Sequence, residues 1–384
     1  MIPYGRQSIS EDDIQAVVDV LRSDFLTQGP IVPKFEKKVC DYTTAKYAIA
    51  VNSGTSALHL ACLALGLTKG DWFWTTPVSF VASANCGLYC GAQVDFVDID
   101  PLTWNMSTEK LKEKLVQAKH EDRLPKVLVA VHFCGLPCDM EEIYVLSQEY
   151  GFRIIEDACH AIGGRYQDEP VGNCRYSDIT VFSFHPVKTI TTGEGGMAIT
   201  NDKKLAEKME LLRSHGITRN PNLMTHVPDG PWYYQQIDLG FNYRMTDIQA
   251  ALGNSQMYRL DDFVSKRHKI AERYRKMLAD LPLHLPHSST SKYSGFHLYV
   301  VRLLSEKVTG THREIFDALR GKGIGVNSHY IPIHTQPFYQ KMGFRCGDFP
   351  QAESYYAETI SLPMYPDLTK DMQEKVVDAL RELL

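Results

Sequence analysis

The chain has 384 residues, of which 44% are apolar and 23% are charged. This balance is typical of a folded protein of two to three domains at roughly 150 residues each, and it excludes a largely disordered or fibrous chain. The 41 Lys and Arg residues against 46 Asp and Glu residues give a net charge of −5. That charge argues against nucleic acid as the main partner, because neutralising phosphates needs a basic face.

The start of the chain is polar and turns acidic at residues 11–13, whereas a secretory signal would be cationic and then apolar. No apolar run approaches the roughly 20 residues that a membrane span needs. These features predict a cytoplasmic protein that does not use a membrane.

The nine cysteines are scattered through apolar stretches, which indicates reduced thiols rather than a disulfide framework. Three residues separate Cys86 from Cys90 and Cys134 from Cys138, and this is not the spacing of a zinc knuckle. We therefore expect no metal site.

Short apolar runs alternate with helical patterns from residue 48 to about residue 200. Continuous apolar runs are typical of strands buried on both faces, and hence of a mainly parallel sheet wound by right-handed crossovers. We predict an α/β protein with a seven-stranded sheet, whose strands are Ala48–Val51, Trp72–Thr75, Val94–Val97, Val127–Val131, Arg153–Ile155, Ile179–Phe184 and Met197–Thr200.

Helical patterns dominate beyond residue 205. The predicted helices are Leu205–Leu212, Thr246–Leu260 and Asp262–Leu281, and the Pro-, Asn- and aromatic-rich residues Gly216–Tyr234 are predicted to form a long loop. An αβ segment follows, with strands at His297–Leu303 and Gly325–Tyr330 and a helix at Thr311–Leu319. This organisation predicts a large domain over residues 1–250 and a smaller αβ domain over residues 251–384.

A glycine and hydroxyl residues, Ser53 to Ser56, follow the first predicted strand and open a helix. Backbone N–H groups, hydroxyl donors and the positive end of the helix dipole together make a seat for a phosphate group. A plain helix cap explains the same residues equally well.

Lys188 follows a predicted apolar strand and precedes the glycine-rich turn Gly193–Gly196. A lysine at the end of a buried strand is partly desolvated, which favours the neutral amine and suits a Schiff-base nucleophile. The alternative is a loop lysine that reaches solvent.

Asp157 and His160 come directly after another predicted strand. Open α/β sheets bind their ligands at the carboxyl edge of the strands, and a carboxylate there suits a protonated ring nitrogen. The alternatives are a helix cap for Asp157 and a hydrogen-bonded core histidine for His160. Strand ends that gather can bring the phosphate seat, the acid and Lys188 around one planar phosphorylated cofactor.

Six segments taken together resemble the DegT/DnrJ/EryC1/StrS family of sugar aminotransferases, and the resemblance runs from Pro3 to the final helix. The segments are NSGTSALHLA, TPVSFVASAN, VDFVDIDP, EDACHAIGG, FSFHPVKTITTGEGG and GFNYRMTDIQAALG. The resemblance implies fold type I, which is the aspartate aminotransferase-like fold, with pyridoxal 5′-phosphate (PLP) as cofactor.

The resemblance also implies roles for particular residues. Lys188 would bind the cofactor covalently and carry a proton, Asp157 would keep the pyridine nitrogen protonated, and His160, where many relatives have glutamine, would lie near the phenolic oxygen. The other implied contacts are Phe80 on the ring face, Gly54, Thr55 and Ser183 at the phosphate, and Asn242 from the neighbouring subunit of a homodimer.

Within the family, PYGRQSI, SDFLTQGP, HYIPIHTQPFY and FPQAESYYAETISLPMYPDLT resemble the enzymes that aminate C4 of a UDP-sugar in pseudaminic acid biosynthesis. This implies a UDP-linked 2-acetamido-2,6-dideoxy-4-keto-hexose of β-L-arabino form as acceptor and L-glutamate as donor. The implied sugar contacts are Tyr4, Asp24, Phe25, Leu26, Thr27, Asn327, Ser328, His329 and Tyr330. A plain edge strand is the alternative for the last four.

Three other functions stay open. The first is an aminotransferase whose acceptor is a different nucleotide-linked keto sugar, such as the D-xylo epimer or a dTDP-sugar. The second is a PLP-dependent sugar dehydratase, and the third is a non-catalytic sensor on the same fold. Dehydratase relatives replace the Schiff-base lysine with histidine, and this chain keeps Lys188. The acid, the lysine and the phosphate seat together argue against the sensor.

Overall fold

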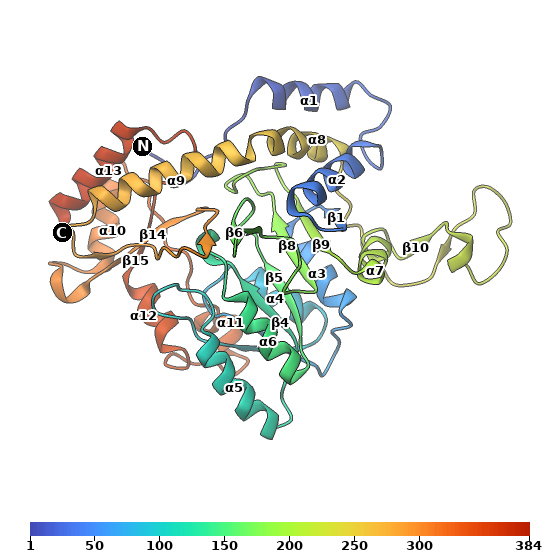
Figure 1. The fold of residues 1–384 in the computed structure, drawn as a ribbon, viewed down its shortest axis with the longest axis horizontal. Coiled ribbons are helices and arrows are strands. Elements are labelled where there is room, and N and C mark those ends of the chain that lie inside the picture. Colours follow the sequence, from blue (N-terminus) through green and yellow to red (C-terminus); the bar gives the residue numbers. More distant parts are fainter.

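A computed structural model describes residues 1–384, and its centre is a seven-stranded sheet of order β1-β9-β8-β5-β4-β2-β3 (Figure 1). The strand β9 is antiparallel to its neighbours β1 and β8, and the other pairs are parallel. The predicted seven-stranded, mainly parallel sheet is therefore confirmed. Its strands are β1 (Tyr47–Val51), β2 (Trp72–Thr75), β3 (Gln93–Phe96), β4 (Pro125–Val131), β5 (Arg153–Asp157), β8 (Ile179–Ser183) and β9 (Gly196–Thr200).

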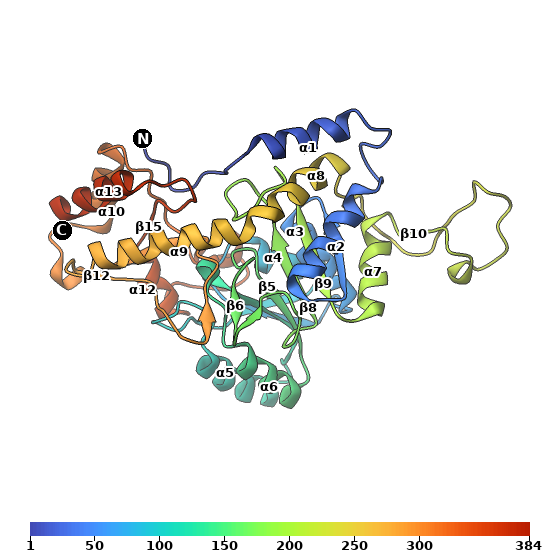
Figure 2. The same ribbon diagram turned by 45° about the horizontal axis from the view of Figure 1, so that its top comes forward.

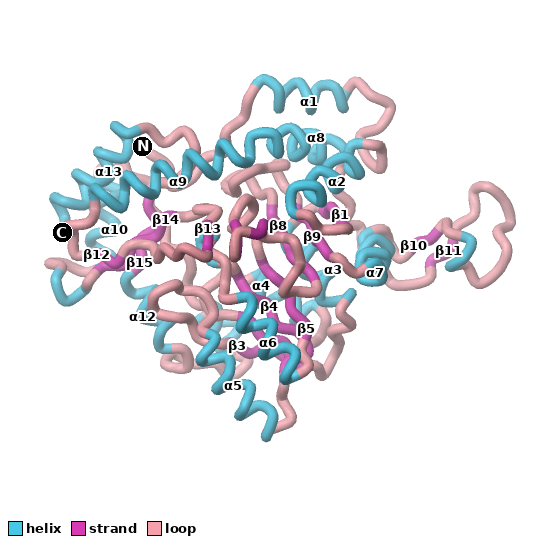
Figure 3. The backbone as a smooth tube through the Cα atoms, in the orientation of Figure 1, coloured by secondary structure: helices cyan, strands magenta, loops and turns pink.

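Helices cover both faces of this sheet (Figure 3). Successive side chains of a strand point to opposite faces, so in β4 Val129 packs into one apolar cluster and Leu128 into another. This two-sided burial is why the strands read as continuous apolar runs. The helices on the Val129 side are α3 (Gly54–Ala64), α4 (Ala82–Tyr89) and α7 (Lys203–Arg213), and those on the other side are α5 (Thr108–His120), α6 (Met140–Tyr150), α2 (Ile31–Thr43) and α8 (Asp247–Gln256).

The C-terminal part of the chain has an apolar core of its own. The long helix α9 (Leu260–Met277) continues from α8 through a 3₁₀ turn and runs to this core (Figure 2). The core also includes a three-stranded antiparallel sheet of order β12-β14-β15. Its elements are β12 (Leu283–His284), β14 (Tyr299–Leu303), β15 (Thr359–Leu362), α10 (His312–Gly321) and α13 (Lys370–Leu383).

Other C-terminal elements pack on the main sheet instead. Tyr339 of α11 (Pro337–Gln340) and Tyr355 of α12 (Pro350–Glu358) belong to the large cluster under α3. A small sheet joins β13 (Lys292–Tyr293) to β6 (Arg165–Tyr166) and β7 (Glu169–Pro170). The predicted domain boundary between residues 250 and 251 falls inside α8, and the division into two domains stays a prediction.

The first residues of the chain are attached to the C-terminal core. The Ile2 N–H donates to the Gly323 carbonyl at 2.8 Å, and the Gly325 N–H donates to the Ile2 carbonyl at 2.6 Å. The chain then returns through α1 (Glu11–Leu21), which lies along α8 (Figures 1 and 2). Tyr4 is thereby placed next to the C-terminal part of the chain.

Two predicted segments differ from the structure. Residues Gly325–Tyr330 do not form the predicted strand, because pairing is limited to a bridge between Asn327 and Ser361 and the Asn327 side chain accepts the Ser328 N–H at 2.9 Å. The predicted loop Gly216–Tyr234 is mostly irregular, but its base is a short hairpin of β10 (Ile217–Thr218) and β11 (Gln235–Gln236). This hairpin segment projects far from the body of the molecule (Figure 1).

No helix of the structure has both the length and the apolar character that crossing a membrane requires. All nine cysteine side chains are free thiols.

Candidate active site

The strands β1, β5 and β8 end at one edge of the sheet, because β1 and β8 are each antiparallel to β9 and β8 is parallel to β5. A cavity of about 1020 Å³ lies at this edge. The cavity is lined by most of the site residues predicted from the sequence, namely Tyr4, Gly54, Thr55, Phe80, Asp157, His160, Ser183, Lys188, Asn327, Ser328, His329 and Tyr330.

The start of α3 forms one wall. Ser53 caps the helix by accepting the Ser56 N–H at 3.1 Å, and the N–H groups of the first turn, at Gly54 and Thr55, have no carbonyl partner within the helix. A Cβ atom at Gly54 would lie 2.9 Å from the Ser183 Cβ. Glycine is therefore what lets the helix start approach β8 so closely. Ser53 supplies the cap, which leaves the first-turn donors available to an anion.

Asp157 is the last residue of β5, and its side chain is only 5% exposed. One carboxylate oxygen accepts the Ser83 hydroxyl at 2.6 Å, and the other accepts the Cys159 N–H at 3.2 Å. The Ser79 hydroxyl is 2.7 Å from that of Ser83. No helix begins after β5, so Asp157 is not a helix cap. These donors fix the carboxylate at the edge of the cavity.

Lys188 lies in the turn that follows β8, where its backbone N–H donates to the His185 carbonyl at 2.9 Å. Its side chain is half-buried and lines the cavity rather than reaching away from it. Burial lowers the pKa of the Lys188 amine, although Cys159 and Asp157 oppose this shift. The neutral, nucleophilic amine is thus easier to reach than in a solvent lysine.

His160 is buried beside Lys188. Its Nε2 is 3.3 Å from the Tyr330 hydroxyl, and its Nδ1 is buried without a hydrogen-bond partner. The ring lies 4.4 Å from that of His297 between centroids. Burial, then Lys188 and His329, lower the pKa of His160 well below its ordinary value, so its imidazole is neutral at physiological pH.

Five of the predicted site residues do not line this cavity. Asn242 and residues 24–27 are exposed. Thr27 forms an isolated bridge with Thr246, and the main chain of Asn242 pairs with that of Ser214. These pairings hold residues 24–27 beside the start of α8 and outside this cavity, so their contact with the sugar stays a prediction.

The sequence did not single out Ser83 and His297 as site residues. Ser83 lies in the quoted segment TPVSFVASAN, four residues after Ser79, and this pair of hydroxyl residues is a signal that could have been used. His297 precedes β14 and lines the cavity only because the chain folds back onto His160.

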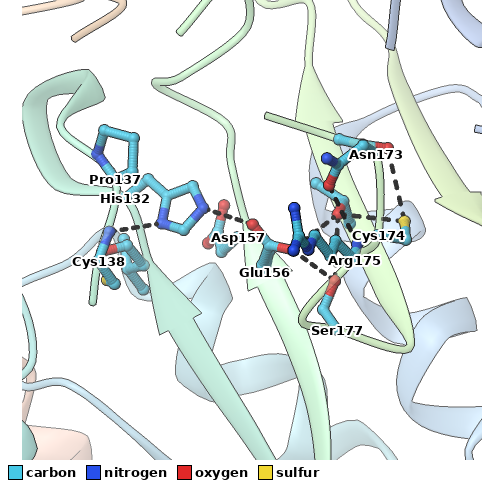
Figure 4. A network of polar contacts seen from close by, with 12 residues as sticks. His132, Pro137, Cys138, Glu156, Asp157, Asn173, Cys174, Arg175 and Ser177 are labelled. Carbon is cyan, nitrogen blue, oxygen red and sulfur yellow. Dashed lines mark hydrogen bonds and ion pairs between the residues drawn. The ribbon is translucent and has the colours of Figure 1, made fainter. Parts of the chain in front are cut away.

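A second buried network lies behind Asp157, on the opposite face of β5 (Figure 4). The Cys138 N–H donates to His132 Nδ1 at 3.2 Å, so the ring proton is on Nε2, which lies 2.7 Å from the Glu156 carboxylate. Ser177 and Thr180 donate to the other oxygen of Glu156. Burial raises the pKa of Glu156, but these hydrogen bonds outweigh it and lower the pKa overall.

We expect Glu156→Ala to lower the free energy of unfolding by about 3–5 kcal/mol, because it leaves His132, Ser177 and Thr180 without their acceptor. Glu207→Ala, at an exposed glutamate of α7, is the control and should change it by less than about 0.5 kcal/mol. Since the folded-state pKa of Glu156 lies below the ordinary 4.5, its contribution is present above that pH and is lost as the pH falls further. Urea unfolding at neutral and acid pH measures the loss of unfolding free energy and its pH dependence. If Glu156→Ala lost no more unfolding free energy at neutral pH than Glu207→Ala, the network would not stabilise the fold.

The match to known proteins extends over nearly the whole chain. The DegT/DnrJ/EryC1/StrS aminotransferase family model matches residues 7–381. The chain is 38% identical to the spore coat polysaccharide biosynthesis protein SpsC of Bacillus subtilis, covering 100% of this chain and 97% of that one. It is 37% identical to the UDP-4-amino-4,6-dideoxy-N-acetyl-beta-L-altrosamine transaminase of Campylobacter jejuni, covering 100% and 98%.

A solved structure agrees. The fold superposes with a TM-score of 0.90 on Helicobacter pylori PseC, an aminotransferase involved in the biosynthesis of pseudaminic acid, at 31% identity over 100% of this chain and 98% of that one. The fold is thus that of fold type I aminotransferases, and the cofactor of the family is PLP. The chain belongs to the DegT/DnrJ/EryC1/StrS aminotransferase family, as a PLP-dependent enzyme that aminates nucleotide sugars.

Proposed function

We propose that the enzyme transfers the amino group of L-glutamate to C4 of a UDP-linked 2-acetamido-2,6-dideoxy-4-keto-hexose of β-L-arabino form. The product is UDP-4-amino-4,6-dideoxy-N-acetyl-beta-L-altrosamine, an intermediate of pseudaminic acid biosynthesis. The observation that carries the proposal is that Lys188 and Asp157 share one cavity with Tyr4 and residues 327–330, the segments that resemble those enzymes. The Campylobacter jejuni transaminase and PseC support the same choice by similarity.

The residues of the cavity fit PLP. The unpaired N–H groups at Gly54 and Thr55, with the Ser183 hydroxyl beside them, suit its phosphate. The buried carboxylate of Asp157 suits a protonated pyridine nitrogen, and the unpartnered Nδ1 of His160 suits the phenolic oxygen. Phe80 lines the cavity with 57% of its surface exposed and offers a ring face for stacking.

When bound, PLP would supply an aldehyde carbon that carries the amino group from donor to acceptor and a ring that withdraws electrons. The protein's own part is to hold and to move protons. Lys188 Nζ would hold the cofactor covalently, and its free amine would take the proton from the donor Cα and return one on the acceptor side. The carboxylate of Asp157, which two donors hold in place, would face the ring nitrogen. Tyr4 and His329, whose rings lie 5.4 Å apart, face the sugar.

We expect a strong preference for the β-L-arabino acceptor over its D-xylo epimer, which differs only at C5. A misplaced methyl group in a shaped pocket costs about 10- to 200-fold in kcat/KM. The altered ring shape also moves the ketone away from the reacting nitrogen, which adds about another 100-fold. Side-by-side kinetics with glutamate, together with NMR of the product, measure this preference.

Equal rates on the two epimers, or a preference for the D-xylo sugar, would reject this acceptor and leave the aminotransferase activity intact. The same assay with dTDP-linked 4-keto sugars is the control for the nucleotide. The control is needed because the chain is as similar to SpsC, a protein of spore coat polysaccharide biosynthesis, as to the Campylobacter jejuni transaminase, so similarity alone does not choose the sugar nucleotide.

The active enzyme is, in our proposal, a homodimer in which two chains build each site. Five predicted site residues lie outside the cavity and are exposed beside the start of α8, namely Asn242 and residues 24–27. The projecting hairpin segment likewise exposes large apolar side chains, with 84% of Val227 and 72% of Trp232 accessible. Exposed groups of this kind are what a second copy would cover.

Mixing Lys188→Ala and Asn242→Ala chains should restore activity, because a mixed dimer has one site free of both substitutions. With equal amounts and free exchange, about a quarter of the wild-type activity is expected. The control is Lys188→Ala mixed with the Lys188→Ala/Asn242→Ala double variant, which provides no intact site. No recovery after demonstrated subunit exchange would exclude a shared site.

A further inference from the structure

The hydrogen bond between Tyr330 and His160 links two segments that are far apart in the sequence. The Tyr330 hydroxyl lies 3.3 Å from His160 Nε2, and the two rings are nearly parallel with centroids 6.1 Å apart. No other protein group accepts a hydrogen bond from this hydroxyl. Burial raises the pKa of the Tyr330 hydroxyl far above its ordinary value, so it keeps its proton. Tyr330 is thus the donor and Nε2 the acceptor.

This donor decides where the single proton of the neutral His160 ring lies. An imidazole nitrogen that accepts a hydrogen bond carries no proton, so the ring N–H must be on Nδ1. Nδ1 is the atom that is buried without a partner in the protein, and His160 lines the cavity that holds Lys188 and Asp157. A buried N–H of this kind needs an acceptor from a ligand, since leaving it unpaired is costly.

We infer that Tyr330 is a positioning residue for the cofactor: it fixes the tautomer of His160, so that Nδ1–H donates to the phenolic oxygen of PLP and favours the phenolate. This inference rests on the proposed binding of PLP at Lys188. It gives Tyr330 a role that differs from direct contact with the sugar. A hydrogen bond to the charged form of a group lowers its pKa, so Tyr330 lowers the pH at which bound PLP changes its absorbance.

The charged and titratable groups around this pair do not substitute for Tyr330. Those that face His160 or Tyr330 are Lys188, His297, His329, Asp157, Cys134, Cys159 and Tyr4. The ring of His297 lies close to that of His160 at a tilt of 44°. Burial, with His160 as the next cause, lowers the pKa of His297 well below the ordinary value, so it adds no charge. None of them is hydrogen-bonded to Nε2.

The test is a pH titration of the absorbance of the PLP-loaded enzyme. Tyr330→Phe keeps the ring and removes the donor, so both His160 tautomers become accessible, and the apparent pKa of the cofactor should rise by about 0.4–1 pH unit. In a His160→Gln background the side-chain amide donates without help, so Tyr330→Phe should then have no effect. Tyr4→Phe, which removes another tyrosine hydroxyl of the cavity wall, should leave the cofactor pKa unchanged.

An unchanged pKa in Tyr330→Phe, or an equal shift in the His160→Gln background, would overturn the inference while the proposed function stands. A wild-type enzyme that takes up no PLP, and so shows no cofactor absorbance, would overturn both. If Tyr330→Phe does not fold, ¹⁵N NMR of histidine-labelled wild-type holoenzyme, with His160 assigned by comparison with His160→Gln, decides the same point. The proton is expected on Nδ1, and a signal from a protonated Nε2 would overturn the inference.

Discussion

Lys188→Ala is expected to lower kcat by about 10⁴-fold or more, because in the proposed function Lys188 both attaches the cofactor and carries the proton. Borohydride reduction of the wild type should fix the cofactor on the peptide that contains residue 188, and the variant should lose this adduct. Mass spectrometry of the digested protein reads out the position.

Lys204→Ala is the matched control, since Lys204 is exposed on α7, and it should keep both the adduct and the activity. A reduced adduct on any other lysine of the wild type would overturn the assignment. The variant should still fold. The turn after β8 depends on the backbone N–H of residue 188, which donates to the His185 carbonyl, and not on the Lys188 side chain.

Asp157→Asn is expected to lower kcat by about 10²–10³-fold, as removal of a preorganised charge at a reacting group does elsewhere. The amide has the size of the carboxylate, so the cofactor should still attach to Lys188 and the loss should lie in turnover. Steady-state kinetics, with absorbance to follow cofactor content, separate the two effects.

Ser83→Ala isolates one of the supports of Asp157. It removes the 2.6 Å hydrogen bond to the carboxylate and keeps the charge, so the loss of activity should be about tenfold or less. If Asp157→Asn were no more impaired than Ser83→Ala, the charge of Asp157 would not be the important property.

The strands and the main site residues could be predicted because they depend on local patterns. Buried parallel strands read as apolar runs, and their carboxyl ends must meet at one edge, which brings Asp157 and Lys188 together. The strand expected at Gly325–Tyr330 was wrong because Asn327 bonds its own neighbour, a competition that residue types alone do not decide.

Contacts between distant segments could not be predicted in this way. The pairing of Tyr330 with His160, and of His160 with His297, depends on how the C-terminal part packs against the sheet. Ser83 lies in the motif TPVSFVASAN, but the motif does not show which of its side chains bonds Asp157. The rotation of α4 about its axis decides that Ser83 is the donor. The exposure of Asn242 depends likewise on the pairing of its main chain.

The attachment of Ile2 to Gly323 and Gly325 has a mechanical consequence. The Tyr4 carbonyl also accepts the Met364 N–H at 2.9 Å, so the first residues are fastened to the C-terminal core on two sides. A shift of that core relative to the sheet would carry Tyr4 and Asn327, which pairs with Ser361 of β15, away from Lys188 and Asp157, and it would break the hydrogen bond between Tyr330 and His160. Tyr4 and Asn327 would then move together as one part of the cavity wall.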